Sequence, residues 1–274
     1  MKIHIPISNR STLRMTITTL AFAGVALALS SFRVNAGSDD KFIAGDSVTI
    51  GGAEVSTWAR VNGGGKVIWV ALTIPASLAD SPPAPGTGPA GAFAVLNYPA
   101  IVQQTTYFNH AEIQSNDHGH PANPGYANTN RYMEAHFDFH FYGIPVAQVY
   151  PIPFLPPFPP LPTVPPERLP AGYAQPEFSV PQMGRHAAPL SEFTATDPWL
   201  ATMIAGFLPD ASYMHFMEPM ITHEFLQRRQ NFSLPVPQPA VLGRATQYPT
   251  ECVVAYDKDA DAFHIVFKGF ETIN

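Results

Sequence analysis

The sequence predicts a mainly β protein, a single antiparallel β-sandwich or barrel-like domain with few short helices. Three observations support this fold class. Runs rich in β-branched and aromatic residues recur along the chain, and polar or glycine-rich turns separate them. Long segments with an apolar period of 3.6 residues are absent from the sequence. A proline-rich stretch interrupts the strand pattern, which resumes after it.

Residues 1–36 are predicted to be a signal peptide, followed by one β-rich domain over 37–274. Three basic residues precede an apolar run, Met15–Leu29, and Val34-Asn35-Ala36 offers small residues for cleavage. The apolar run is short for a transmembrane helix, although an uncleaved anchor is the alternative. We therefore expect a protein exported to the periplasm or the extracellular space, with no membrane insertion after cleavage.

Charge and cysteine content limit the partners. The leader holds four of the 15 basic residues and none of the 21 acidic ones, so the net charge after cleavage is about −10. Such a surface repels nucleic acid and anionic membranes and attracts cations. Cys252 is the only cysteine, which excludes an intramolecular disulfide. We interpret it as a small buried hydrophobe, and expect stability to come from burial and from bound metal.

Three hairpins and one helix are predicted in chain order. Each hairpin joins two strand-like runs through a glycine, proline or acidic turn. The paired runs are Val55–Val61 with Val67–Ile74, Thr202–Phe207 with Tyr213–Met217, and Cys252–Tyr256 with Phe263–Phe267. The stretch Ile221–Arg229 is predicted to form a short helix, with His223 as a surface or capping residue.

Residues 151–170 contain ten prolines in twenty positions. Proline has no amide donor and a fixed φ, so this stretch is neither a helix nor a central strand. We predict a polyproline II insertion within the domain, kept ordered by Phe154, Leu155, Phe158 and Leu161. The aromatic surface of this insertion is also a candidate contact for a homo-oligomer.

Histidines and acids gather in two stretches, Asp117-His118-Gly119-His120-Pro121 and His136-Phe137-Asp138-Phe139-His140-Phe141-Tyr142. Alternate side chains of a strand share a face. His136, Asp138 and His140 would therefore lie on one face and the phenylalanines on the other. Imidazoles together with a carboxylate suit a divalent transition metal, and zinc is our first choice.

Spacing limits which side chains share an ion. Residues i and i+2 of a strand have Cα atoms about 6.6 Å apart, which suits chelation by His118 and His120. His136 and His140 would lie about 13 Å apart on a straight strand. We therefore expect one of two arrangements. Either only one of these two histidines binds the ion directly, and Asp138 orients an imidazole that binds it, or there are two metal sites.

Two further donors are candidates by type. His186 follows the proline-rich insertion, and Glu218 ends an apolar strand, where an acid without a partner is costly to bury. His215 should alternate to the face opposite Glu218. The alternative to a metal site is a buried polar network that supports an irregular loop. The complete predicted metal set is His118, His120, His136, Asp138, His140, His186 and Glu218.

The order of these motifs resembles a family of uncharacterised exported bacterial proteins. That family is catalogued as a domain of unknown function and includes a Thermus protein controlled by an extracytoplasmic-function sigma factor. The resemblance covers roughly residues 45–270 and implies a β-rich single domain whose signature residues are the His/Asp/Glu set. It implies no settled activity, and the proline-rich insertion here is longer than in the family. The motifs are His118-Gly119-His120-Pro121, His136 to Tyr142, Pro170-Ala171-Gly172-Tyr173, Met183-Gly184-Arg185-His186 and Glu218-Pro219-Met220-Ile221-Thr222.

Two functions follow from such a set. In the first, the protein binds metal without catalysis, and the ion fixes a fold that has no disulfide. In the second, it is a metal-dependent hydrolase or oxygenase, in which three protein ligands leave a position for water or dioxygen and Glu218 or Asp138 acts as general base. Coordination number separates them, because a fourth protein ligand favours a structural role and an open position favours chemistry.

Overall fold

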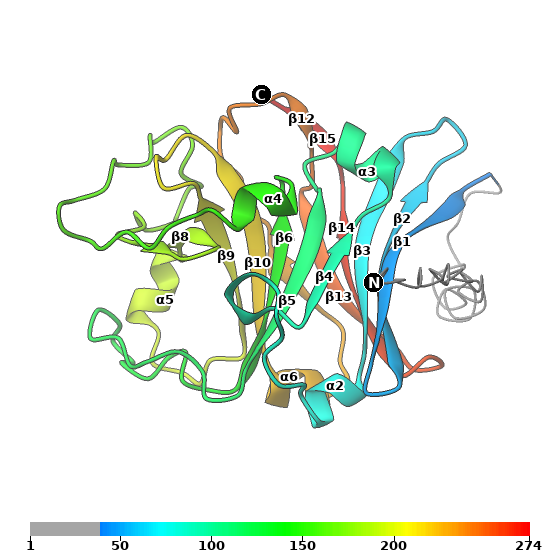
Figure 1. Ribbon diagram of the computed structural model, residues 1–274, viewed down its shortest axis with the longest axis horizontal. Helices are drawn as coiled ribbons and strands as arrows, with labels where there is room; N and C mark the ends of the chain where they lie inside the picture. The colour runs from blue at the N-terminus through cyan, green and yellow to red at the C-terminus, as the bar shows by residue number, and fades with distance from the viewer. Residues whose placement is uncertain (1–38) are drawn as a thin grey trace, which may run out of the picture.

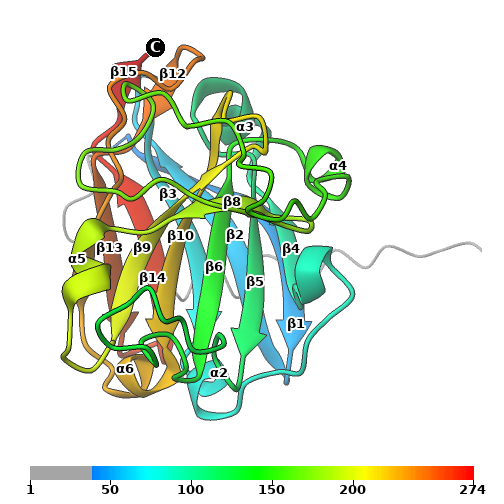
Figure 2. The ribbon, with the colours of Figure 1, turned by 90° about the vertical axis from the view of Figure 1, so that its left-hand side faces the viewer.

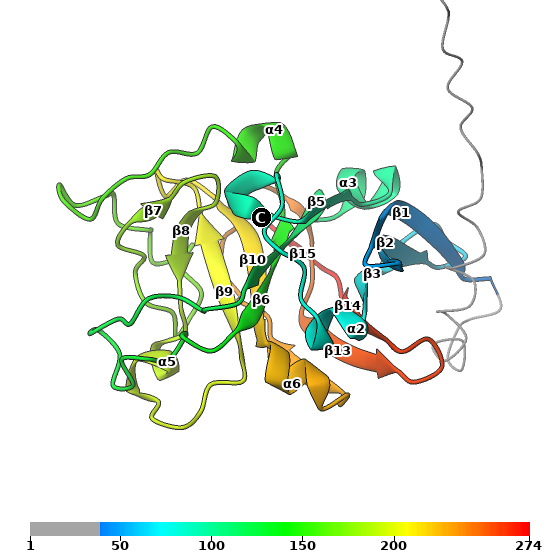
Figure 3. The same ribbon diagram turned by 60° about the horizontal axis from the view of Figure 1, so that its bottom comes forward.

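The structure is a computed structural model that describes residues 39–274, and the predicted signal peptide lies outside these residues. Two antiparallel sheets pack face to face and form the two layers seen in Figures 1 and 3. The predicted mainly β fold class is confirmed. No helix within residues 39–274 has the length and apolar character needed to cross a membrane.

The first sheet has six strands, and its central strands are the two predicted hairpins at the ends of the chain. Val55–Val61 pairs with Val67–Ile74, and Cys252–Tyr256 pairs with Phe263–Phe267, as predicted. In spatial order the strands are β1 (Lys41–Ile50), β2 (Ala53–Val61), β3 (Val67–Pro75), β14 (Ala262–Lys268), β13 (Glu251–Asp257) and β11 (Phe232–Pro235).

The second sheet has seven strands and carries five of the seven predicted metal residues, all except His118 and His120. The third predicted hairpin is confirmed in it, although its second strand runs on to Thr222. In spatial order the strands are β4 (Ala94–Asn97), β5 (His110–Asn116), β6 (His136–Tyr142), β10 (Met214–Thr222), β9 (Ala201–Phe207), β8 (Gly184–Ala187) and β7 (Ser179–Val180).

The remaining elements are short. A small two-stranded sheet pairs β12 (Thr246–Tyr248) with β15 (Glu271–Ile273) near the C-terminus. The helices within residues 39–274 are α2 (Ser77–Asp80), α3 (Ala100–Thr105), α4 (Val146–Val149), α5 (Leu190–Thr194), α6 (His223–Gln227) and a 3-10 turn, η2 (Pro89–Gly91). Helices α2 and α6 lie at one end of the two layers, where Gln227 Nε2 donates to the Ala79 carbonyl at 2.8 Å (Figure 3).

The main core lies between the two sheets. Phe137, Phe139 and Phe141 of β6 enter it from the second sheet, and all three are fully buried. Leu72 and Phe267 are among the residues that meet them from the first sheet. Alternation along β6 then turns the polar residues of this strand to the outer face of the second sheet. The strand pattern read from the sequence therefore places the polar set outside the main core.

Long connections cover that outer face. Figure 2 views it directly, with the segment between β5 and β6 and the segment between α4 and β9 crossing in front of the strands. A second apolar cluster, which includes Tyr142, Trp199 and Phe216, packs beneath them. The outer face is consequently buried too, and every residue of β6 and β10 is buried.

Helix α6 is present where predicted, but the role predicted for His223 is wrong. The capping side chain is that of Thr222, whose hydroxyl accepts a hydrogen bond from the Phe225 backbone amide at 3.2 Å. His223 is instead 7% exposed and packs its ring 4.4 Å from that of Phe137. The residue before it had the better capping chemistry, because a threonine hydroxyl accepts readily at an N-terminus.

The proline-rich insertion is neither a helix nor a central strand, as predicted. Two of its four predicted anchors, Phe154 and Phe158, are wrong, whereas Leu155 and Leu161 are half-buried. Phe154 and Phe158 are 58% and 79% exposed, so neither anchors it. The backbone amides and carbonyls of Leu155 and Ser179 exchange two hydrogen bonds of 3.1 and 2.9 Å. The buried Arg185 guanidinium donates to the Pro162 carbonyl at 2.6 Å and also to that of Pro176. Because prolines lack amide donors, their carbonyls need outside donors such as this arginine.

Candidate metal centre

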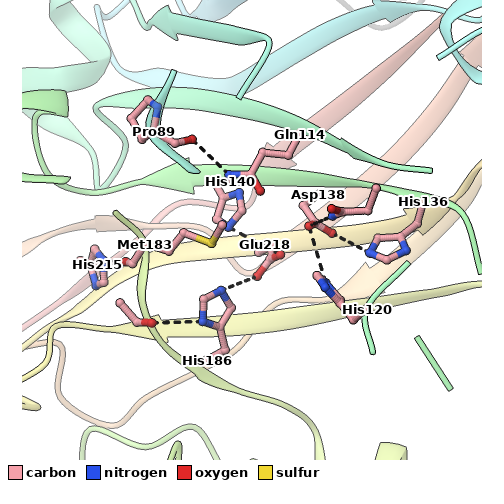
Figure 4. A network of polar contacts seen from close by, with 12 residues as sticks. Pro89, Gln114, His120, His136, Asp138, His140, Met183, His186, His215 and Glu218 are labelled. Carbon is pink, nitrogen blue, oxygen red and sulfur yellow. Dashed lines mark hydrogen bonds and ion pairs between the residues drawn. The ribbon is translucent and has the colours of Figure 1, made fainter. Parts of the chain in front are cut away.

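Two groups of histidine and acidic side chains, each placed so that it could hold a metal ion, lie side by side on the outer face of the second sheet (Figure 4). We name His120, His136 and Asp138 the first cluster, and His140, His186 and Glu218 the second cluster. In each group the ligand atoms all lie within 4.8 Å of one another. Each group offers two imidazoles and one carboxylate, a set typical of zinc and of non-haem iron.

The first cluster joins strand β6 to the segment that follows β5. His136 Nε2 lies 3.1 Å from Asp138 Oδ1, and His120 Nε2 lies 3.7 Å from Asp138 Oδ2. His136 Nδ1 donates to the Glu134 carbonyl at 2.6 Å, which fixes the ring and leaves Nε2 facing the cluster. Asn116 Nδ2 donates to Asp138 Oδ2 and holds the carboxylate in place.

The turn at Gly119 places His120 beside His136 and Asp138 of strand β6. The φ of Gly119 is +61°, a backbone conformation that favours glycine, and a Cβ there would lie 2.3 Å from the Met133 carbonyl carbon. The turn it makes lets the His120 amide donate to the Tyr132 carbonyl at 2.6 Å. The His-Gly-His motif therefore works as a turn that delivers one imidazole, and not as a chelating pair on a strand.

The first cluster carries charge even before an ion binds. Burial alone would raise the pKa of Asp138, but the contact and charge of His136 outweigh burial and hold that pKa below its usual value. Burial alone would lower the pKa of His136, but Asp138 and the Glu134 carbonyl outweigh burial, so the pKa of His136 is raised above its usual value. The pair is thus stabilised in its ionised form, with His136 Nε2 and Asp138 Oδ1 close together but without hydrogen-bond geometry.

The second cluster is assembled from three strands. His140 comes from β6, Glu218 from β10 and His186 from β8. Glu218 Oε1 lies 3.6 Å from His140 Nε2, and Glu218 Oε2 lies 3.6 Å from His186 Nε2. His186 Nδ1 donates to the Gly184 carbonyl at 3.2 Å, which turns its Nε2 toward the carboxylate. The two Nε2 atoms and the carboxyl group of Glu218 therefore face one another within 4.8 Å.

The second cluster is electrically neutral, in contrast to the first. Burial lowers the pKa of His140 to about 3 and that of His186 to about 4. Burial, followed by the charge of Asp138, raises the pKa of Glu218 well above its usual value. Within residues 39–274, Glu218 Oε2 and both ring nitrogens of His140 are buried without a hydrogen-bond partner. Neutral imidazoles are the form that binds metal, and a cation would supply the missing partner.

Access to both clusters runs along their least buried members. The side chains of His120 and His186 are 43% and 23% exposed, whereas the other four are at most 2% exposed. Two surface cavities of about 340 and 320 Å³ lie at the proline-rich insertion and beside Gly64–Val67, and no cluster residue lines either. Each cluster therefore meets solvent mainly through one histidine side chain, His120 in the first and His186 in the second.

Six of the seven predicted metal residues fall into the two clusters, and His118 does not. His118 is exposed and belongs to neither group. The predicted orientation of His215 is wrong, because β10 has an irregular register between Met214 and Phe216. This irregularity turns the His215 ring toward Tyr142, 5.8 Å away on the outer face, and His215 Nε2 donates to the Met183 carbonyl at 2.7 Å.

The sequence analysis missed the polar residues of β5. His110, Glu112, Gln114 and Asn116 alternate along this strand as the histidines do along β6. The two strands pair antiparallel, so these side chains share the outer face with the clusters. The same period of two that identified β6 would have found them, because polar residues recur at every second position from 110 to 116.

We compared the chain with protein-family models, with curated proteins and with solved structures, and none of the three comparisons gave a match.

Proposed function

We propose that this protein is an exported metal-dependent hydrolase that holds two divalent transition-metal ions, zinc by preference, one in each cluster. The observation that supports it best is the number of donors. Within residues 39–274 each group contains three protein ligands, two imidazoles and one carboxylate. Structural zinc sites have four protein ligands, whereas catalytic sites have three and keep a position for water.

The chain's own residues would supply the setting for such chemistry. A bound divalent ion lowers the pKa of a coordinated water to near neutrality, which makes a nucleophile. Asp138 and Glu218 are donors in this arrangement, so neither is left over as a separate general base. Trp199 packs 4.9 Å from the His136 ring, and Phe216 lies 5.0 Å from the His140 ring. These aromatic walls exclude bulk water and strengthen electrostatic interactions inside the site.

A purely structural role for the ions is the second candidate. The observation in its favour is that Cys252, the only cysteine, is unpaired and buried. The location of the clusters argues against it, because they lie outside the main core between the sheets. An ion on the outer face would hold the covering segments more than the sandwich itself.

Elemental analysis and melting curves separate the two. The protein purified without affinity nickel should contain two ions per chain, and chelation should remove them while the sandwich stays folded. Loss of the cooperative transition on chelation would assign the ions a structural role. Metal content well below one ion per chain would contradict both candidates. Iron in place of zinc would shift the proposal to an oxygenase, since two histidines and one carboxylate also bind ferrous iron.

Export and family membership are part of the same proposal. The basic, apolar and small-residue succession of the first 36 residues supports export, and N-terminal sequencing of the secreted protein tests cleavage after Ala36. Membership of the uncharacterised exported family rests on the motif order given above. A homo-oligomer formed through the exposed Phe154 and Phe158 is a further expectation, which light scattering of the purified protein tests.

A further inference from the structure

Four buried side chains, two on β5 and two on β6, lie next to one another beside the second cluster. Glu112 of β5 is paired directly with His140 of β6, and His110 is paired with Tyr142. All four are 0% exposed. The ring of Tyr142 stacks on that of His110 at 4.8 Å and on that of His140 at 5.6 Å, with interplanar angles of 10° and 11°. Three nearly parallel rings thus lie in a row, and the Glu112 carboxyl contacts the first of them, that of His110.

Four polar atoms of these side chains have no hydrogen-bond partner among residues 39–274, namely Glu112 Oε2, the Tyr142 hydroxyl and both ring nitrogens of His140. Glu112 Oε1 lies 3.1 Å from His110 Nε2, but Glu112 Oε2 has no hydrogen-bond partner. His140 Nε2 faces Glu218, and His140 Nδ1 has no partner either. Glu112 and His140 are directly opposite each other. Such residues have Cβ atoms about 4.5–5.5 Å apart, which is close enough for a rotation of the two side chains to join Glu112 Oε2 and His140 Nδ1.

His140 differs in this respect from two other proposed ligands. His136 Nδ1 is bonded to the Glu134 carbonyl, and His186 Nδ1 to the Gly184 carbonyl. Histidines that bind metal almost always donate their other ring N–H to a carboxylate or a carbonyl, which fixes the ring and makes the ligand more basic. The described residues give His140 no such contact, and Glu112 is the acid paired with it.

We propose that Glu112 is the positioning residue of the second cluster: its carboxylate accepts a hydrogen bond from His140 Nδ1–H when His140 Nε2 binds the ion, while His110 holds the other carboxylate oxygen. The proposal rests on the proposed function, because it needs an ion at the second cluster. The cation favours the ionised carboxylate, and the carboxylate in turn offsets charge in a buried site.

The test uses the full chain with Asp138→Asn, which disables the first cluster, so that only the second cluster binds cobalt(II). Replacing Glu112 by glutamine keeps its shape and removes its charge, and should weaken cobalt binding about 10- to 100-fold. Gln114 is the matched control, since it is the next residue on the same face of β5. Gln114→Met should change the affinity by less than about 3-fold.

Proton NMR of the cobalt-loaded protein reports the contact itself. The exchangeable Nδ1–H resonance of His140 should shift in Glu112→Gln, while that of His186 stays in place, a change that a merely structural role would not produce. If Glu112→Gln does not fold, His110→Phe serves as the second variant. It keeps the ring stack on Tyr142 and removes the hydrogen bond between His110 Nε2 and Glu112 Oε1. It should then weaken cobalt binding in the same direction by a smaller factor.

The outcomes are distinct. An unshifted His140 resonance together with unchanged affinity in Glu112→Gln would overturn the role of Glu112 and leave the proposed function standing. A shift caused by Gln114→Met alone would assign the role to Gln114 instead and equally overturn it. Failure of the Asp138→Asn parent itself to bind cobalt would contradict the metal site, and this inference with it.

Discussion

The two clusters have the same donors but opposite electrostatic states. In the first cluster, His136 and Asp138 face each other at 3.1 Å, and Asn116 and the Glu134 carbonyl support them. In the second, the nearest contacts are 3.6 Å, and burial keeps both imidazoles and the carboxyl neutral. Position on the sheet decides which effect dominates. At the start of β6 the contact and charge between His136 and Asp138 outweigh burial, whereas burial dominates where three strands meet.

The largest expected effect is on acid stability of the metal-free protein. A histidine whose folded pKa lies below 6.5 takes up protons first in the unfolded state, so its contribution is lost as pH falls below about 6.5, by up to about 1.4 kcal/mol per pH unit for each ring. Burial is the main cause in every case. The histidines are His110, His140 and His215, with a pKa lowered to about 3, and His186, with a pKa lowered to about 4.

Buried acids act in the opposite direction above pH 4.5. Burial raises the pKa of Glu112 to about 8 and that of Glu218 well above its usual value, so their contribution falls as pH rises. The free energy of unfolding of the metal-free protein should therefore peak near pH 6.5. Urea titrations between pH 4 and 8 measure it, and a curve that is flat below pH 6.5 would contradict neutral buried histidines.

Paired carboxamide substitutions sharpen the comparison. Glu218→Gln and Asp138→Asn should each remove one of two bound ions, as counted by mass spectrometry. In the metal-free protein the effects should differ. Asp138→Asn breaks a buried ion pair and should cost about 2–3 kcal/mol of unfolding free energy. Glu218→Gln replaces an uncharged group by another and should change it by less than about 1 kcal/mol. Equal losses in both variants would mean that the clusters do not differ in charge.

Metal binding at the first cluster should depend on an ion pair outside it, between Arg131 and Glu192. Arg131 Nε donates to Glu192 Oε2 at 2.6 Å and fastens the segment that carries His120 to helix α5. Arg131→Met should weaken metal binding at the first cluster about 10-fold, because His120 loses its preorganised position, and leave the second unchanged. Arg60 is the control, since its contact with Asp40 is similarly buried on the other sheet. Equal weakening by Arg60→Met would point to general destabilisation.

The smallest effect is expected at His118. This histidine is exposed and outside both clusters, so His118→Ala should retain two ions per chain. His120→Ala should lose one. Loss of an ion from the His118 variant would require a rearrangement of the turn at Gly119.

The features that the sequence could predict are those that depend on the alternation of side chains along a β-strand. The three hairpins and the two faces of β6 depend on alternation along a strand, which is local and readable. The exclusion of His118 depends on the turn at Gly119 packing against Met133, a contact between residues 14 apart that no pattern reports. The same holds for the exposed Phe154 and Phe158, because the anchors of the insertion, Arg185 and Ser179, come from later in the chain.

The geometry of the sites depended on pairing between distant strands. Spacing along β6 left open whether His136 and His140 belong to one group of donors or to two. The answer came from Glu218 and His186, which strands β10 and β8 place beside His140. Strand order is a long-range property, so the sequence identified the donors without assigning them to groups.

Anomalous diffraction from crystals of the zinc-loaded protein tests the account most directly. Two zinc peaks per chain are expected, one bound by His120, His136 and Asp138 and the other by His140, His186 and Glu218, each with a position open to water. A single peak, a fourth protein ligand at either ion, or zinc bound elsewhere on the chain would contradict it.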